Sequence, residues 1–474
     1  MFMDAKLLHQ QVEEYIKSKR SEYIADLGAL VEIESVGTAP EGRYVFGKGS
    51  AQAIDKMLDI GKGYGFKTEN HDYYCASLIY GDSEEEMGIV AHLDVVPAGE
   101  GWTYPPYKLT VENELLIGRG TEDDKGPAVA ALYALRFFKD KGIKLPFSLR
   151  LIMGGDEERG MNDLPYFLKS HKAPFFSFTP DSEFPVCTGE KGIGKLDIKL
   201  PAVLENIEYM EGGTVTNAVA GKAFAVVKNI TGKNLKAADG ISLEYSDGKA
   251  KITATGKTAH AALPEEGQNA IAMLAAYLLD NVALNDSEKQ SLEFLKKTCA
   301  EYLGTQLNIQ DSTELMGYLT CVGGLLKTVD GALVQNYNIR FPRSGSWQRI
   351  KENATATAAQ YGAVIIKDTH SDGYCFDPNK PEIQALTEAC ELVTGEDSKP
   401  YTMGGGTYAR SFPNTVAFGS TIAKYRGLLG EGRGKAHDRD EYLSIAEFEK
   451  SVEIFVISIA KIADIKREEK EKKI

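Results

Sequence analysis

The sequence predicts an α/β fold, in which a domain with a largely parallel central sheet flanked by helices is interrupted by an inserted α+β domain. Three observations predict it. The chain has 474 residues, which exceeds the size at which a single hydrophobic core stops growing. Helical and strand-like segments alternate as far as about residue 187, and hairpin-like segments then replace them. Long helices return after about residue 379, so we expect the first domain to be split in sequence.

The first part, residues 1–187, contains helices that follow strands. Residues 51–65 have helical spacing and end at a glycine, and residues 87–96 form an apolar run typical of a buried strand. Residues 126–142 read as a helix with a proline near its start and a glycine past its end. The apolar segment 149–153 predicts the next buried strand. Strands separated by helices favour parallel pairing.

The inserted part, residues 188–379, shows hairpin and alternating-strand patterns in place of strands separated by helices. Residues 241–256 alternate on both sides of Asp247-Gly248, which is a strong hairpin signal. A helix over residues 269–281 and an alternating strand over residues 333–342 follow. Hairpins with helices packed on one side predict a separate α+β domain.

The last part, residues 380–474, returns to long helices. We expect them over residues 381–395 and 445–465, with the glycine-rich stretch TMGGGTYARSF between them. This part should complete the first domain.

Composition excludes several classes of function. Apolar residues make up 43% and charged residues 26% of the chain, as in an ordinary globular protein. A formal net charge of −14 argues against nucleic acid or an anionic membrane as a partner. The six cysteines have no regular spacing, and the N-terminal stretch is charged and amphipathic, so we expect reduced thiols and a cytoplasmic protein.

Four stretches place polar side chains where a predicted element ends or begins. In AHLDVVP, His92 follows apolar residues, and Asp94 lies two positions on, on the same side of a strand. A metal-binding imidazole commonly donates its second N–H to a carboxylate, and Asp94 is spaced to accept it. Taken alone, His-x-Asp is also frequent in protein cores and hairpins.

The other stretches have ordinary explanations when each is taken alone. Asp123 and Asp124 precede a helix, where one aspartate would serve as an N-cap. Asp181 follows an apolar stretch and would form an acidic turn. His437 precedes the last helix and would cap it or lie at the surface.

Taken together, these residues indicate a metal site. The acidic run 156–158 follows the strand 149–153, and the carboxyl ends of strands in an open α/β sheet gather at one crevice. Two imidazoles with four carboxylates suit Zn²⁺ or a similar first-row ion. Five ligands with one shared carboxylate would hold two ions about 3.5–4 Å apart. One acid is left over, so one of Glu157 and Glu158 should bind metal and the other should transfer protons. The six residues are His92, Asp123, Glu157, Glu158, Asp181 and His437.

The motifs AHLDVVP, GRGTEDDKG, GGDEERG, TPD and GKAHDRDE, in this order, resemble a known family. It is the zinc-dependent metallopeptidase family that includes acetylornithine deacetylase, succinyl-diaminopimelate desuccinylase, aminoacylase and carboxypeptidase G. The length, GKTAHAALPEEGQNAI and GGGTYAR look most like its dipeptidase V branch, also called Xaa-His dipeptidase or carnosinase-like.

The resemblance implies a role for each residue of the centre. Asp123 would bridge the two ions, and the peptide bond between Asp123 and Asp124 would be cis. Glu157 would be the general base, and Asp94 would orient His92. The remaining ligands would be His92 and Asp181 for one ion, and Glu158 and His437 for the other.

The resemblance also makes the inserted domain a lid over a catalytic domain. His260 would polarise the scissile carbonyl, and Asn217 would hold the substrate. Arg340 would bind the terminal carboxylate of the substrate through two hydrogen bonds. The backbone N–H groups of Gly405 and Gly406 are candidates for substrate contacts.

The predicted function is therefore that of a metal-dependent dipeptidase that cleaves unblocked dipeptides, including the Xaa-His and β-Ala-His types. Two divalent ions per subunit are expected, with Zn²⁺ preferred and Mn²⁺ compatible. An N-acyl amino-acid deacylase or desuccinylase would use the same centre, and a non-catalytic metal-binding scaffold is the alternative from a different class. No G-x-S-x-G motif supports a serine hydrolase. We expect a small peptide substrate and a monomer, with a homodimer left open.

Overall fold

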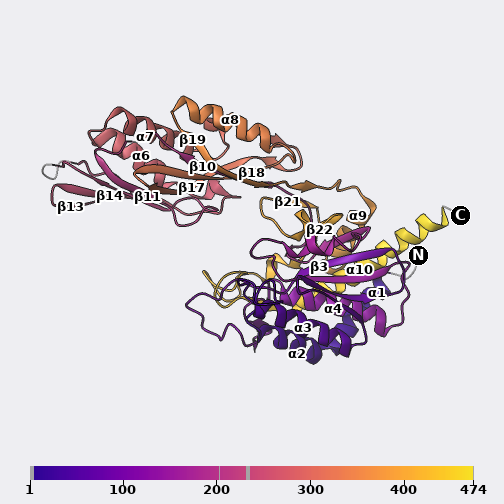
Figure 1. Cartoon of the computed structure of the whole chain (residues 1–474). Helices are drawn as coiled ribbons and strands as arrows, with labels where there is room; N and C mark the ends of the chain where they lie inside the picture. The colour runs from indigo at the N-terminus through magenta and orange to yellow at the C-terminus, as the bar shows by residue number, and fades with distance from the viewer. Residues whose placement is uncertain (1–4, 202, 231–234, 473–474) are drawn as a thin grey trace. The chain divides into compact units, whose positions relative to one another are not determined.

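The computed structural model describes residues 5–201, 203–230 and 235–472. The chain forms two compact units, which are labelled by their helices and strands in Figure 1. Unit 1 comprises Met1–Thr188, Cys375–Tyr401 and Gly406–Ile474, and unit 2 comprises Gly189–Tyr374 and Thr402–Gly405.

These bounds differ from the predicted range of the inserted domain, 188–379, at its C-terminal side. The main chain of Phe376 donates a hydrogen bond of 2.7 Å to the carbonyl of Thr188. Residues 375–379 therefore belong to unit 1.

A mixed sheet forms the centre of unit 1. Its strands run in the order β1-β2-β6-β3-β7-β22-β9. The four central strands β6, β3, β7 and β22 are parallel, whereas β1–β2, β2–β6 and β22–β9 are antiparallel pairs. The sheet is therefore parallel at its centre and antiparallel towards both ends. Its strands are β1 (Lys67–His71), β2 (Cys75–Tyr80), β3 (Glu86–His92), β6 (Ser148–Gly154), β7 (Phe176–Thr179), β9 (Val186–Glu190) and β22 (Thr415–Phe418).

Helices enclose this sheet. Every residue of β6 is buried, as are all but the first of β3, which is the burial expected of strands covered on both faces. The helix α4 packs on β3 and β6, while α3 packs on β1 and β2. The helices of unit 1 are α1 (Ala5–Ser18), α2 (Arg20–Val31), α3 (Lys48–Gly63), α4 (Lys125–Asp140), α5 (Asp163–Phe167), α9 (Pro381–Thr394) and α10 (Ile445–Glu471).

Short strands complete unit 1, and two of them, β20 and β21, lie where the chain passes from one unit to the other. The strand β24 pairs with β5, which pairs with β4, and β23 pairs with β8. Their bounds are β4 (Thr110–Glu112), β5 (Leu115–Ile117), β8 (Ser182–Glu183), β20 (Tyr374–Cys375), β21 (Tyr401–Met403), β23 (Ser420–Thr421) and β24 (Tyr442–Ser444).

The register of the parallel strands decides where the polar residues meet. His92, the last residue of β3, is the partner of Gly154, the last residue of β6. On the other side of β3, Ile89 pairs with Phe178, near the end of β7. The chain therefore leaves these three strands at the same edge of the sheet, which is where parallel sheets bind ligands.

The described residues of unit 2 form an antiparallel sheet together with the helices α6, α7 and α8. Its order is β13-β14-β12-β11-β17-β18-β10-β19. Burial alternates along β10 and β12, as expected when one face is covered and the other is open. Helices α6 and α7 pack on each other and on the sheet, and α8 packs on β19. Figure 1 labels all three helices. The elements are β10 (Gly192–Lys199), β11 (Ile207–Gly212), β12 (Lys222–Val227), β13 (Ile241–Ser246), β14 (Lys249–Thr255), α6 (Ala270–Asn281), α7 (Asp286–Cys299), β15 (Ser312–Thr313), β16 (Gly317–Tyr318), β17 (Thr320–Val329), β18 (Ala332–Phe341), α8 (Trp347–Gln360) and β19 (Val364–Ser371).

The predicted hairpin is present as β13 and β14. Asp247 and Gly248 at its turn have φ values of 51° and 73°, the left-handed backbone that a two-residue turn of this kind requires. The predicted α/β fold with an α+β insertion is confirmed. Among the described residues, no helix combines the length and the apolar character that crossing a membrane would require.

Candidate metal centre

Five segments of unit 1 bring the predicted ligands together. His92 ends β3, and Glu158 lies in the turn that follows β6. Asp181 lies two residues beyond β7, and Asp123 lies two residues before α4. His437 arrives from the segment before β24, so a strand lies between it and the last helix, contrary to the expectation that it precedes that helix directly.

Two groups of potential ligand atoms share Asp123. In the first group, His92 Nε2 lies 2.9 Å from Asp123 Oδ1 and 3.9 Å from Asp181 Oδ2. In the second, His437 Nε2 lies 3.0 Å from Asp123 Oδ2 and 3.0 Å from Glu158 Oε1. Each oxygen of Asp123 therefore faces a different imidazole, which is the arrangement of a bridging carboxylate.

The spacing of these atoms fits metal ions. Bonds of about 2.0–2.2 Å at angles of about 90–110° would separate two ligand atoms by about 2.8–3.6 Å. Three of the four distances fall in this range, and the distance from His92 to Asp181 is slightly wider. His92 Nε2 and Asp123 Oδ1 are both buried and make no hydrogen bond. Two neighbouring buried polar atoms without hydrogen-bond partners are expected where both are metal ligands.

The electrostatics of the centre also favour a cation. Burial raises the pKa of Asp181, and the nearby carboxylates of Asp123 and Glu157 raise it further. Hydrogen bonding to Asp123 and Glu158 raises the pKa of His437 to about 10. Such shifts arise because negative charge is concentrated where little water can screen it, and positive charge would relieve them.

Asp94 supports the centre differently from the prediction. His92 Nδ1 lies 3.0 Å from the main-chain oxygen of Asp94 and 3.5 Å from its carboxylate. The carboxylate instead accepts the backbone N–H groups of Glu157 at 3.2 Å and Glu158 at 3.1 Å. Asp94 thus orients the imidazole through its carbonyl and the acidic turn through its side chain.

Asp124 is not a helix cap in the usual sense. It occupies the N-cap position of α4 but makes no capping hydrogen bond from its side chain. Its Oδ2 accepts the backbone N–H of His92 at 3.0 Å. The peptide bond between Asp123 and Asp124 is cis, as the resemblance implies.

The three acids that follow β6 have different surroundings. Asp156 is buried and accepts the backbone N–H and the side-chain amide of Asn162, so it shapes the turn. Glu158 faces His437. Glu157 makes no ion pair in the described structure, and burial raises the pKa of its carboxyl. These differences favour Glu158 as the ligand and Glu157 as the proton-transfer group.

A buried ion pair that the sequence analysis missed holds the loops of the centre together. Arg119 donates to the Oε2 atom of Glu441, and both side chains are almost fully buried. Glu441 Oε1 accepts the backbone N–H of Asp123 at 3.0 Å, and Arg119 Nη2 donates to the carbonyl of His437 at 3.3 Å. The only sequence signal was a pair of charged residues, one between two glycines and one directly before a short buried strand.

Three residues of unit 2 that were predicted to contact the substrate lie in one region, namely Asn217, His260 and Arg340. The segments of Asn217 and His260 are adjacent, because the backbone N–H of Ala261 donates to Asn217 at 2.9 Å. Burial lowers the pKa of His260, and the nearby positive charge of Arg340 lowers it further. Arg340 Nη1 donates to the carbonyl of Gly404 at 3.0 Å.

The tautomer of His260 suits a hydrogen-bond donor. Its Nδ1 lies 3.2 Å from the backbone nitrogen of Ala262 and accepts that N–H. The neutral ring therefore carries its proton on Nε2. Gly405 belongs to unit 2 and Gly406 to unit 1, and their contacts with substrate stay a prediction.

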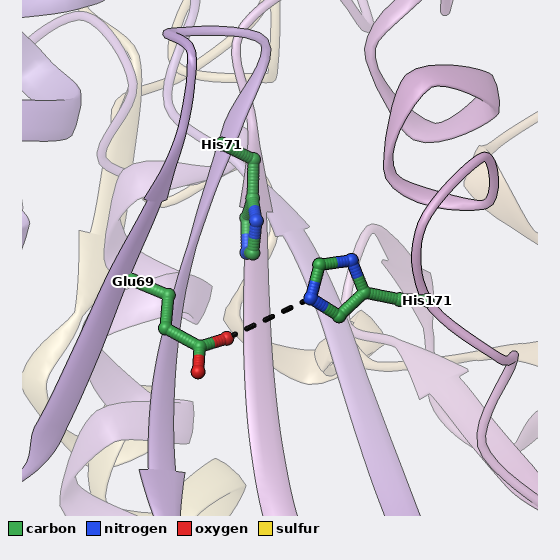
Figure 2. A group of neighbouring side chains, drawn as sticks. All are labelled: Glu69, His71 and His171. Atoms are coloured by element: carbon green, nitrogen blue, oxygen red, sulfur yellow. Dashed lines mark ion pairs between the residues drawn. The ribbon is translucent and has the colours of Figure 1, made fainter.

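A third group of side chains has the composition and the close spacing of a possible metal site. Figure 2 shows Glu69, His71 and His171, with His171 Nε2 3.9 Å from Glu69 Oε2. Both oxygens of Glu69 already face cations, since Oε2 lies 2.7 Å from Arg150 and Oε1 lies 3.0 Å from Lys67. We therefore assign this group to an ion-pair network at the edge of the sheet.

Comparison with known proteins identifies related sequences over most of the chain. The model of the peptidase family M20/M25/M40 matches residues 88–461. A β-Ala-Xaa dipeptidase of Lactobacillus delbrueckii subsp. lactis is 30% identical over 468 residues, which cover 94% of this chain and 97% of that protein.

Solved structures show the same fold at lower identity. Human carnosine dipeptidase 1 has a TM-score of 0.57 and 15% identity, covering 96% of this chain and all of that one. The aminoacylhistidine dipeptidase of Vibrio alginolyticus has a TM-score of 0.55 and 15% identity, with 92% and 96% covered. At these identities the likeness concerns the fold alone.

Proposed function

The chain belongs to the peptidase family M20/M25/M40, and from this premise we propose that it is a dipeptidase with two divalent metal ions. The observation that carries the proposal is the position of Asp123, whose two oxygens face His92 and His437. The relative from Lactobacillus, which is named a β-Ala-Xaa dipeptidase, supports a substrate of two residues.

In this proposal five residues would hold the ions, and Asp123 would be shared. His92 and Asp181 would complete one site, and Glu158 and His437 would complete the other. Zn²⁺ and Mn²⁺ both suit this mixture of imidazole and carboxylate. Bound there, the ions would supply Lewis acidity that polarises the scissile carbonyl and makes water a nucleophile at neutral pH.

Glu157 acts as the general base and acid. It lies beside the ligand Glu158, and the backbone of both residues is fixed by the carboxylate of Asp94. Burial raises the pKa of the Glu157 carboxyl, and a more basic carboxylate is a better proton acceptor. Glu157 takes a proton from water and delivers it to the departing amine.

Residues of unit 2 bind the rest of the substrate. Arg340 holds the terminal carboxylate, because a guanidinium matches a carboxylate with two parallel hydrogen bonds. His260 donates its Nε2–H to the carbonyl oxygen as negative charge develops there. Asn217 lies beside His260 and holds the substrate next to it.

An N-acyl amino-acid deacylase is the second candidate, because Arg340 would bind the carboxylate of an N-acyl amino acid equally well. The test is hydrolysis by metal-stripped protein after addition of Zn²⁺ or Mn²⁺. Its substrates are β-Ala-His, Ala-Ala and Gly-Leu, compared with N-acetyl and N-succinyl amino acids. We expect cleavage of the free dipeptides and little of the blocked compounds. Cleavage confined to the blocked compounds would overturn the dipeptidase assignment, and no cleavage of either class would overturn the proposed hydrolase.

A further inference from the structure

Unit 2 contains a large cavity that the proposed chemistry does not use. Its volume is about 740 Å³, within the range of small-molecule binding sites. Its wall includes residues from the segment after His260, from the segment after α7 and from the start of β17. The ones that matter here are Ala262, Leu263, Tyr302, Leu303, Tyr318 and Thr320.

The cavity is next to the proposed carboxylate site. Thr320 on β17 is the register partner of Arg340 on β18, so their side chains lie on the same face of the sheet. The hydroxyl of Thr320 donates to the carbonyl of Ala261 at 2.9 Å, which ties the floor of the cavity to the residue after His260.

A second contact links the cavity to Arg340 from the other side. A side chain at Gly404 would come within 2.7 Å of the Cβ atom of Ala262, so these two backbones pack closely. Gly404 is the residue whose carbonyl accepts the hydrogen bond of Arg340. Ala262, which lines the cavity, therefore packs against the residue that accepts the hydrogen bond of Arg340.

The cavity exposes large apolar side chains. Leu263, Leu303 and Tyr318 are 53%, 48% and 66% exposed, and all three line it. One such residue at a surface is unremarkable in a folded protein, whereas several around one cavity mark a binding site.

Two of the three charged residues that line the cavity, Lys191 and Glu301, already have hydrogen-bond partners in the chain. The ammonium group of Lys191 donates to the carbonyl of Tyr318. Glu301 accepts the backbone N–H groups of Leu303 at 2.8 Å and of Gln306 at 3.2 Å. Glu265 is the remaining charged residue of the wall, and the apolar side chains are the larger feature that would select a ligand.

We propose that this cavity is the specificity pocket for the side chain of the C-terminal residue of the substrate, and that it favours bulky apolar and aromatic side chains. The inference rests on the proposed function for the position of the substrate carboxylate at Arg340. A side chain begins one bond from the carbon that bears this carboxylate, so it would enter the cavity that adjoins Arg340.

The test changes Leu303, which is half exposed and lies outside the proposed catalytic residues. The variants are Leu303→Gln and Leu303→Lys, with Tyr318→Gln as a second position and Val364→Lys as the matched control. Val364 is 55% exposed on β19 and does not line the cavity. Each protein is assayed for kcat/KM on Ala-Gly, Ala-Phe, Ala-Glu and the reversed dipeptide Phe-Ala, after its metal content and thermal stability have been measured.

We expect both Leu303 variants and Tyr318→Gln to lower kcat/KM for Ala-Phe by about ten-fold, the usual effect of one apolar contact in a specificity pocket. Activity on Ala-Gly and Phe-Ala should change by less than two-fold. Leu303→Lys should also improve the ratio of Ala-Glu to Ala-Phe. The control should match the wild type on every substrate.

Three outcomes would overturn the pocket: an equal loss on all dipeptides, a loss confined to Phe-Ala, or no change. A parallel series with N-acetyl-Gly and N-acetyl-Phe separates the two proposals. If the wild type cleaves only these compounds, the dipeptidase assignment is wrong. The pocket would then stand if the variants lose N-acetyl-Phe selectively, and it would fall if they do not.

Discussion

Asp123 is the residue on which the candidate metal centre depends most. A carboxylate that faces two imidazoles 2.9 and 3.0 Å away can serve two ions at once. The position of Asp123 is fixed at its backbone, because its N–H donates to Glu441. A side chain that bridges two ions must be held in this way, since a small displacement would weaken both sites.

Replacing Glu157 with glutamine should stop turnover without removing metal. The amide keeps the size of the side chain but cannot accept a proton, so we expect kcat to fall by about 100- to 10,000-fold. Metal content, measured on the same preparation by inductively coupled plasma mass spectrometry, should stay at the wild-type value. A variant with near-normal turnover would show that another group transfers the proton.

His71 should make stability depend on pH. Burial lowers the pKa of His71 to about 4, with further lowering by His171 and Arg150 and opposition from Glu69 and Asp72. In the unfolded chain the pKa is about 6.5, so between these values the unfolded state binds more protons and the folded state is destabilised. The contribution of neutral His71 is therefore complete above about pH 6.5 and is lost as the pH falls towards 4.

The variant His71→Gln checks this expectation. The free energy of unfolding of both proteins is measured by denaturant titration at pH 7, 5.5 and 4.5. As the pH falls, it should decrease less for His71→Gln than for the wild type. The glutamine has no proton to take up, so this part of the acid sensitivity disappears. Curves that stay parallel for the two proteins would contradict the assignment.

At the scale of elements, the ends of three parallel strands deliver His92, Glu158 and Asp181, and one buried ion pair connects the segments that carry Asp123 and His437. β3 and β6 end in register at His92 and Gly154, so the loops after them begin side by side. Arg119 and Glu441 then connect the loop before α4 with the segment that carries His437. Segments that are distant in sequence are thus connected around the centre.

Glu441→Gln should weaken metal binding even though Glu441 is not a proposed ligand. The glutamine leaves the buried guanidinium of Arg119 without a counter-charge and loosens the loop of Asp123. Loss of such a supporting group typically costs 10- to 100-fold in metal affinity. A titration with Zn²⁺ against a competing chelator measures it.

Glu431→Gln is the matched control, because Glu431 is an exposed acid in the loop before His437. Its metal affinity should equal that of the wild type. Affinity within two-fold of wild type for Glu441→Gln would remove the ion pair from the account of the metal centre.

The strands and helices that deliver the ligands could be predicted because burial imposes their patterns. The apolar run 149–153 became β6, and the helix predicted over residues 126–142 is α4. The support of the centre could not be predicted, because it depends on contacts between distant segments. Asp124 looked like a helix cap, yet its side chain accepts the backbone N–H of His92. Nothing local in the sequence pairs Arg119 with Glu441.

At the scale of the whole molecule, the proposed chemistry draws on both units. Unit 1 holds the candidate metal ligands and Glu157, and unit 2 holds Asn217, His260 and Arg340. The roles of these three came from the resemblance alone, because an asparagine in a loop or an arginine on a strand has no local signature. Within unit 2, His260 accepts the N–H of Ala262 and Arg340 donates to Gly404, and the roles of both residues in catalysis stay predictions.

His260→Ala should lower turnover while the metal sites stay filled. Loss of one donor to the developing oxyanion typically costs about 100- to 1,000-fold in kcat. His370→Ala is the matched control, since His370 is an exposed histidine on β19 of the same unit. Steady-state kinetics with metal analysis checks both variants. Unchanged turnover for His260→Ala would remove unit 2 from the chemical step.

The central claim is that Asp123 joins two metal ions, and anomalous diffraction from crystals of the Zn²⁺-loaded protein tests it most directly. The account predicts two anomalous peaks about 3.5–4 Å apart, one beside His92 and Asp181 and the other beside Glu158 and His437, with Asp123 between them. A single peak, or peaks away from Asp123, would contradict it.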